Sequence, residues 1–342
     1  MRKILQNIFR PFFVWLAAHT SAAPNQELVF KSLSKLYKKI LAKNSSRGIL
    51  IDIDSITDPF IIFSDQHKGT KDKGDDFKNN ETNYIAALQY YLQHQYTFIN
   101  LGDAEELWKY SAGNVIPKNR EALIAEANFH LNKKYYRTFG NHDLLWKNSL
   151  DVQMQLKDLF QMPLPVYEGI VLRLVVTVKE LPQTIHIFLT HGHQGDKMSD
   201  NNALSTWLVA HIWAPIQRAL EININTPATN FQLRDKHNRI MYEWSSRKKN
   251  TLLITGHTHK PVFASGRYTD NEAHKMELEY EHKDVHSSYF NSGCCCFNDG
   301  DITGIEIAED TIRLIKWHTG SDVPKRIVLE EKSLKDIIAD LR

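Results

Sequence analysis

Short apolar runs that end in polar residues recur along the chain. One such run, at 252–255, is followed by Gly256, His257, Thr258 and His259. Its length and composition predict a buried strand, with two histidines directly after the strand end. Four more runs are built in the same way, at 60–63, 96–101, 135–139 and 185–190.

Segments with helical spacing of apolar residues separate these runs. They lie at 26–42, 81–95 and 117–131. Alternating strands and helices are typical of a parallel α/β sheet, in which the ligand crevice lies beyond the carboxyl ends of the strands. A strand at 48–53 and branched residues at 170–178 predict a second or mixed sheet.

The segment between His191 and Leu252 is helical in pattern. We interpret it as an inserted helical cap at about 196–250, beside the crevice, where selectivity for a substrate would arise. The expected organisation is an N-terminal helical segment, residues 1–47, and a main domain, residues 48–342, which contains the cap.

Residues 1–18 place large apolar side chains on one helical stripe with basic residues beside it. Three interpretations remain open: a helix docked on its own protein, a helix lying on a membrane surface, and a cleaved signal peptide. No segment has the length of a membrane span, which excludes a transmembrane protein. The expected location is the cytoplasm, with peripheral contact to the inner face of a membrane through residues 1–18 as the alternative.

Composition narrows the class of partner. The 342 residues are 42% hydrophobic, enough to bury a full core. Lys and Arg number 42 against 40 Asp and Glu, a net charge of +2, so no nucleic-acid partner is expected.

The three cysteines are consecutive: Cys294, Cys295 and Cys296. Such a run does not form a disulfide framework and indicates a reducing compartment. Three neighbouring residues cannot easily turn three sulfurs toward one ion, so a zinc–thiolate site is not expected. We predict that the cysteines pack as small residues in a strand.

The polar residues at the strand ends form a set of metal ligands without a thiolate. The set comprises Asp65, His67, Asp103, Asn141, His191, His257 and His259. Carboxylate, imidazole and amide groups suit manganese, iron, zinc or cobalt. A carboxylate can bridge two ions about 3.5 to 4 Å apart, and such a pair activates water for in-line displacement at phosphorus. Asp103 is the natural bridge.

A charged stretch at 68–78 follows the first of these ligands. We predict a mobile loop beside the site. Its lysines are interpreted either as a solvated charge run or as contacts for an anionic substrate.

Five ordered motifs resemble those of the calcineurin-like metallophosphoesterase superfamily. They are Asp65-x-His67, Gly102-Asp103-x-x-Glu106, Gly140-Asn141-His142-Asp143, His191-Gly192 and Gly256-His257-Thr258-His259. The resemblance spans about residues 60–318. It implies an α/β fold, a four-layer αββα sandwich of two mixed β-sheets flanked by helices, with a two-metal site at the strand ends.

The resemblance also implies a role for each site residue. Asp65, His67, Asp103 and His259 would hold one ion, and Asp103, Asn141, His191 and His257 the other. His142 would stay free of metal and serve the phosphoryl group or the leaving oxygen, with Glu106 as its carboxylate partner. His193 is the alternative to His191 as ligand, or else a neighbour of the ligand or a substrate contact.

Within the superfamily, some local sequence is similar to the UDP-diacylglucosamine hydrolase branch. The similar parts are the sequence at 102–108, the helical insertion and the ending at Pro261. The chain departs from that branch at His193, where the branch has aspartate. The tail at 291–294 looks instead like a turn of other phosphoesterases.

The expected activity is hydrolysis of a phosphate ester or pyrophosphate by in-line attack of a hydroxide that bridges two divalent ions. Manganese is the first choice of metal, with iron, zinc or cobalt as alternatives. The expected substrate is a phosphorylated small molecule or a lipid precursor, such as a UDP-sugar lipid-precursor pyrophosphate. The alternatives are a phosphoprotein or nucleotide phosphatase or phosphodiesterase, and a non-catalytic scaffold of the same fold.

Overall fold

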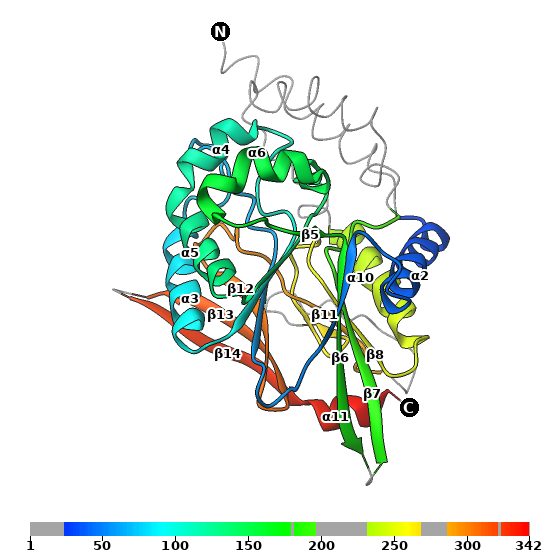
Figure 1. The fold of residues 1–342 in the computed structure, drawn as a ribbon. Helices are drawn as coiled ribbons and strands as arrows, with labels where there is room; N and C mark the ends of the chain where they lie inside the picture. The colour runs from blue at the N-terminus through cyan, green and yellow to red at the C-terminus, as the bar shows by residue number, and fades with distance from the viewer. Residues whose placement is uncertain (1–23, 179–180, 196–230, 268–285, 321–322, 342) are drawn as a thin grey trace.

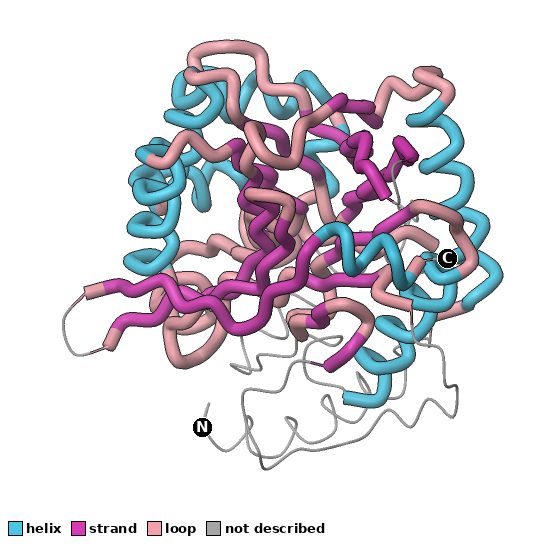
Figure 2. Tube along the Cα trace, turned by 90° about the horizontal axis from the view of Figure 1, so that it is seen from below, coloured by secondary structure: helices cyan, strands magenta, loops and turns pink. Residues whose placement is uncertain are grey.

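In a computed structural model of the protein, two seven-stranded sheets pack face to face, and helices cover both outer faces (Figure 1). The structure describes residues 24–178, 181–195, 231–267, 286–320 and 323–341. Seen from below, the strands lie in the middle and the helices on either side (Figure 2). The expected αββα sandwich of two mixed sheets is confirmed.

One sheet joins four parallel strands to three antiparallel ones. Its order is β14-β13-β12-β2-β3-β4-β5. The parallel strands are β2 (Phe60–Phe63), β3 (Thr97–Leu101), β4 (Tyr135–Thr138) and β5 (Val166–Tyr167). The antiparallel strands are β12 (Ile302–Ala308), β13 (Thr311–Thr319) and β14 (Pro324–Ser333).

The other sheet has the order β1-β6-β7-β8-β11-β9-β10. Its strands are β1 (Gly48–Asp52), β6 (Gly169–Val178), β7 (Leu181–Thr190), β8 (Thr251–Thr255), β11 (Tyr289–Asn291), β9 (Val262–Phe263) and β10 (Gly266–Arg267). Strand β8 runs parallel to both β7 and β11, so the ends of β7 and β8 lie at one edge of the sheet.

Helices complete the outer layers. On the β2 sheet lie α3 (Glu81–Gln93), α4 (Ala112–Lys118), α5 (Arg120–Leu131), α6 (Ser149–Phe160) and the short 3-10 helix η1 (Leu144–Lys147). On the β8 sheet lie α2 (Gln26–Leu41) and α10 (Phe231–Ser246). Helix α11 (Leu334–Asp340) contributes Ile337 and Ile338 to the core between the sheets.

The central strands are apolar because both of their faces are covered. Every residue of β2 and β8 is buried. Ile62 and Ile254 join the core between the two sheets, whereas Phe63 and Leu253 pack under the outer helices. Strands buried on both faces read as continuous apolar runs, which is why the sequence pattern located them.

The helix predicted over 117–131 is wrong at its start. Asn119 has φ −115° and ψ 27°, which ends α4 before α5 begins. Its side-chain amide donates hydrogen bonds to the carbonyls of Gly69 and Val115, at 2.7 and 2.8 Å. Asn119, at the break between the two helices, thus connects α4 to the loop that contains Gly69.

The interpretation of 68–78 as a solvated charge run is wrong for Lys68 and Asp75, whereas Lys73 and Lys78 are exposed. Lys68 is fully buried and lies between Glu105 and Glu126. Asp75 is buried too, and it accepts hydrogen bonds from the backbone N–H groups of Lys71 and Phe77. These contacts compensate for the burial of the two charged groups and hold this part of the loop in one conformation.

Two predicted segments fall wholly or largely outside the described residues: the stripe at 1–18 and most of the cap, 196–230. The rest of the expected cap contains α10, whose Trp244 is buried with Val29 and Leu33 of α2. The Trp244 indole also donates to Ser34 Oγ at 2.9 Å. Among the described residues, no helix combines the length and the apolar character of a membrane span.

Candidate metal centre

The loops that follow five strands bring the predicted ligands together. The loops after β2, β3 and β4 carry Asp65 and His67, Asp103, and Asn141. The loops after β7 and β8 carry His191, His257 and His259. Strands from both sheets end at this edge of the sandwich, and all but His259 are buried there.

Five of these residues have an uncommon backbone conformation. The φ angles are 54° for Asp65, 50° for His67, 51° for Asp103, 69° for His257 and 56° for His259. Residues other than glycine rarely adopt this left-handed region, and such strain persists only where the surrounding structure enforces it. Its concentration at the ligands indicates that the fold holds them in place for a purpose.

Two glycines allow the loops to approach one another. A Cβ on Gly140 would collide with the backbone and side chain of Asp103, and a Cβ on Gly256 would collide with Ser64 and Asp65. The close approach brings the backbone N–H of His142 to Asp103 Oδ1 at 2.8 Å and that of His257 to Asp65 Oδ2 at 2.9 Å. The glycines of these motifs are therefore required by packing between loops.

The first group of ligands surrounds His67 Nε2. This atom lies 3.1 Å from His259 Nε2, 3.7 Å from Asp103 Oδ2 and 3.8 Å from Asp65 Oδ1. His259 Nε2 in turn lies 3.2 Å from Asp65 Oδ1. The donor atoms face one another, with the imidazole nitrogens directed at the carboxylates.

The second group lies on the other side of Asp103. His191 Nε2 lies 3.2 Å from Asp103 Oδ2, and His257 joins the same ligand group. The other ring nitrogen of His191 donates to the carbonyl of Leu101 at 3.0 Å, which fixes the ring and leaves Nε2 facing Asp103. Asn141 Oδ1 is buried without a hydrogen-bond partner among the described residues.

These separations fit metal ions. Ligand atoms that share an ion at about 2.1 Å would lie about 3 to 3.5 Å from one another. The distances of 3.1 to 3.8 Å in the first group and 3.2 Å in the second are close to this range. A buried amide oxygen with no partner is unfavourable until something binds it. The donor set and its geometry both fit divalent cations.

Electrostatics in the site favour ionised carboxylates. Burial opposes the charge on Asp103, but His191 and His142 outweigh it and hold the pKa of Asp103 far below its usual range. Burial likewise opposes protonation of His191 and His259, yet Asp103 and Asp65 raise the pKa of each to about 9. The site thus concentrates negative charge that a cation can neutralise in place of protons.

The ring of His142 lies beside that of His67, with centroids 4.5 Å apart, and has two further neighbours. Its Nδ1 lies 2.9 Å from Glu106 Oε1, and its ring stacks on Trp108 with centroids 4.0 Å apart. Glu106 Oε2 also lies 3.4 Å from His67 Nδ1. The Glu106 side chain therefore reaches His142, as the resemblance implied.

His193 lies near the second group. Its ring centroid is 5.5 Å from that of His191, and burial lowers the pKa of His193 to about 3, which keeps the imidazole neutral. Among the described residues, it is His191 rather than His193 that groups with Asp103 and His257. The assignment of His191 as ligand stays a prediction that this geometry favours.

Sequence reasoning missed two neighbours of the site. His237 of α10 packs against His257 with ring centroids 5.0 Å apart, although its segment had been assigned to the cap. Cys296 lies near His259 and His67, whereas we had expected the cysteines to fill a strand. The three cysteines in fact follow β11, in a buried loop. Neither His237 nor Cys296 has a neighbouring motif in the sequence that would have pointed to the site.

The sandwich and its strand-end ligands define a metal-dependent phosphoesterase. The family model "Calcineurin-like phosphoesterase" matches residues 58–261, and the chain belongs to this family. The metal ligands, the loops that hold them and His142 all lie within the matched region. No curated protein matches the chain.

Several solved structures are similar to this chain at low identity. A dimetal phosphatase from Danio rerio is 10% identical with a TM-score of 0.34, over 80% of this chain and all of the other. Vacuolar Protein Sorting 29 from Cryptosporidium parvum is 14% identical with a TM-score of 0.30, over 81% of this chain and 98% of the other. GAP50, the anchor in the inner membrane complex of Plasmodium, is 12% identical with a TM-score of 0.38, over 83% and 95%. None of these likenesses bears on the activity of this chain.

Proposed function

We propose that the protein hydrolyses a phosphate ester or a pyrophosphate with two divalent ions, manganese first among them. The observation that carries the proposal is the position of Asp103 between the two ligand groups, with Oδ2 within 3.7 Å of His67 and 3.2 Å of His191. When bound, such ions activate water and neutralise charge on the phosphoryl oxygens. Asp65, His67 and His259 would hold one ion, and Asn141, His191 and His257 the other.

His142 is suited to the leaving side of the reaction. Glu106 accepts from His142 Nδ1, so the imidazole can present Nε2 to a phosphoryl or leaving oxygen. Stacking on Trp108 restricts rotation of the ring. Glu106 and Trp108 together orient an acid or hydrogen-bond donor toward the substrate.

The finer proposal is a substrate with an apolar part, such as a UDP-sugar lipid precursor. Leu145, Leu150 and Met154 are large apolar side chains with exposed fractions of 39%, 65% and 79%. Leu145 lies in η1, which begins two residues after His142, and the other two lie on successive turns of α6. Helix α6 adjoins η1, and exposed apolar side chains on adjoining elements are typical of a surface that receives an apolar ligand.

The first experiment tests the activity. Chelated protein, resupplied with manganese, is offered a phosphate monoester, a diester and a UDP-linked pyrophosphate. We expect metal-dependent turnover of one class, and a loss of about 10²- to 10⁴-fold in His142→Ala, the range for removal of an acid–base group. Exposed His94→Ala is the control. Metal-independent turnover, or none of any class, would refute the proposal.

The second experiment tests the apolar part of the substrate. Leu150→Ser with Met154→Ser is expected to raise KM for a diacylated UDP-sugar and to leave KM for its water-soluble deacylated form unchanged. Exposed Ile56→Ser, far along the chain from α6, is the matched control. A KM for the diacylated substrate that is the same in the double variant as in wild type would remove the support for a lipid precursor.

A further inference from the structure

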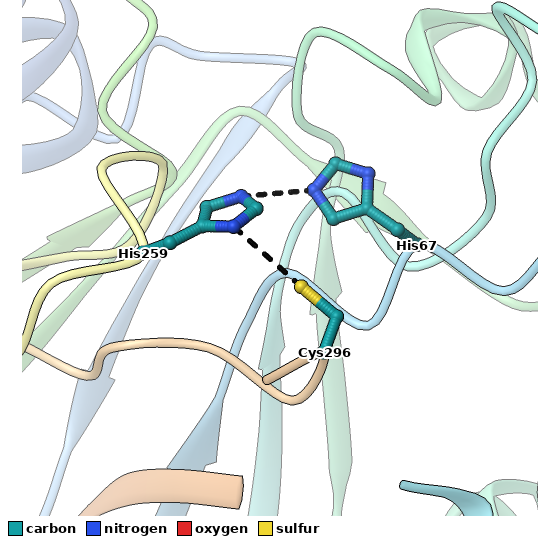
Figure 3. Close-up of side chains that lie close together, drawn as sticks. All are labelled: His67, His259 and Cys296. Atoms are coloured by element: carbon teal, nitrogen blue, oxygen red, sulfur yellow. Dashed lines mark hydrogen bonds between the residues drawn. The ribbon is translucent and has the colours of Figure 1, made fainter. Parts of the chain in front are cut away.

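The two ring nitrogens of His259 have different neighbours. Figure 3 shows one of them near His67 and the other near the sulfur of Cys296. His259 Nε2 lies 3.1 Å from His67 Nε2 and 3.2 Å from Asp65 Oδ1. His259 Nδ1 lies 3.5 Å from Cys296 Sγ. One ring nitrogen thus faces the ligand group and the other faces the thiol.

A histidine that binds an ion through Nε2 carries its proton on Nδ1. That N–H needs an acceptor, and the acceptor fixes the tautomer and the orientation of the ring. For His191 the acceptor is the carbonyl of Leu101, at 3.0 Å. For His259 the corresponding atom is Cys296 Sγ, with the Cys294 thiol as a second neighbour of the ring, where a carboxylate or carbonyl oxygen is usual.

The position of Cys296 is fixed by the same loops that hold the ligands. The N–H of Cys295 donates to the carbonyl of Asp65 at 3.2 Å, and the N–H of Cys294 donates to Thr303 Oγ1 at 3.2 Å. Cys296 itself is nearly fully buried. The sulfur is therefore held in register with Asp65, a neighbour of His259 in the ligand group.

We propose that Cys296 is a positioning residue for His259 and that its sulfur sets the affinity of the first ion's site. This inference rests on the proposed function, since it concerns one of the two ions. It predicts that loss of the sulfur lowers the affinity for the ion held by Asp65, His67 and His259. The affinity for the ion held by His191 and His257 should stay unchanged.

The test is metal binding rather than activity. Wild type, Cys296→Ala, Cys296→Ser and Cys295→Ala, all freed of metal, are dialysed against buffered Mn²⁺, and bound ions are counted. We expect Cys296→Ala to bind the first ion about 10- to 100-fold more weakly, the effect typical of removing a ligand's outer partner, and the second ion unchanged. Cys296→Ser, whose hydroxyl still accepts from Nδ1, should restore most of the affinity.

Cys295→Ala is the matched control. Cys295 is also fully buried, but its sulfur lies 4.0 Å from the carbonyl of Thr303 and packs in the core under the outer helices. The substitution removes the same volume without touching His259. It should leave both affinities unchanged, and thermal unfolding of all four proteins verifies that they fold.

Three results would overturn the inference. The first is an unchanged affinity for the first ion in Cys296→Ala. The second is an equal loss of that affinity in Cys295→Ala, which would mean that the effect comes from packing. The third is an intense sulfur-to-cobalt charge-transfer band in the Co²⁺ form that is lost in Cys296→Ser, which would place the sulfur on the ion itself. If wild type binds no ion, the proposed function fails, and this inference fails with it.

Discussion

Two clusters of buried polar side chains lie side by side at the strand ends, and they differ in what satisfies them. In the metal centre, Asn141 Oδ1 has no hydrogen-bond partner among the described residues, and the imidazole nitrogens face one another across short gaps. In the neighbouring ionic network, every charged group has an opposite charge within 3.5 Å. The network comprises Lys68, Glu105, Glu126, Arg137 and Asp143, all fully buried.

The ionic network explains how the two ligand loops keep their register. Lys68 and Glu105 form a parallel bridge between the loops that carry His67 and Asp103. Tyr84 and Tyr135 donate to Glu126 at 3.0 and 2.8 Å, so the carboxylate is satisfied by neutral groups too. A buried charge by itself therefore does not mark a functional site. The mark is a convergence of ligand atoms whose carboxylates, Asp65 and Asp103, pair with histidines rather than with Lys or Arg in the described part of the chain.

The largest expected change in stability comes from breaking the ionic network. Glu126→Ala leaves Lys68 buried with only the more distant Glu105, and should lower the free energy of unfolding by about 3 to 5 kcal/mol, as for a broken buried pair. Chemical denaturation measures the change. Glu121→Ala, exposed on the same helix, is the control and should change it by less than about 0.5 kcal/mol. A similar small loss in both variants would mean that the network is not needed for stability.

The next prediction, stabilisation of the folded protein by Mn²⁺, distinguishes the metal centre from the ionic network. Adding Mn²⁺ to metal-free protein at 100 times Kd should raise the free energy of unfolding by about 2.7 kcal/mol for each ion bound, because the ions bind only the folded state. Asp103→Ala, which removes the shared carboxylate, should lose this rise, whereas Glu126→Ala should keep it. Thermal unfolding with and without metal gives the comparison. A rise that survives in Asp103→Ala would place the ions elsewhere.

A smaller effect tests the carboxylate that joins His142 to His67. Glu106→Gln keeps the size of the side chain but removes the charge, and should lower kcat about 10- to 100-fold, the range for an outer partner of a site residue. Initial rates at saturating metal measure the change. The free energy of unfolding should fall as well, because Glu106 is buried 3.4 Å from Lys109, so the rates are compared on protein that thermal unfolding shows to be folded. An unaltered kcat would leave Glu106 without the role implied by the family resemblance.

The smallest effect concerns His186, which belongs to neither cluster. Burial, and then Arg173, lower the pKa of His186, whose Nδ1 lies 2.7 Å from the Tyr37 hydroxyl. The folded state binds this proton less readily than the unfolded state, so stability falls as pH drops through the unfolded pKa of about 6.5. His186→Asn should remove this part of the loss between pH 7 and 5 in unfolding experiments. Parallel pH profiles for the two proteins would contradict the assignment.

The apolar pattern alone located the central strands, their ends and the polar residues that follow them, whereas the sandwich was implied by the family resemblance of the motifs. This was possible because strands buried on both faces must be apolar throughout, and because β8 ends directly before Gly256 and β2 ends two residues before Asp65. The sequence also showed which glycines belong to the motifs. Only the folded structure explains why glycine is needed there: Gly140 lies against Asp103, and Gly256 lies against Asp65.

Only the tertiary structure decided which neighbours the ligands have. Lys68 reads as a solvated charge in sequence, yet it is buried because Glu126 comes from a helix nearly sixty residues later along the chain. Cys296 meets His259, and His237 meets His257, through the packing of separate loops and of α10. Local patterns report burial and periodicity. Pairings between distant side chains depend on how the layers pack, and no local pattern encodes them.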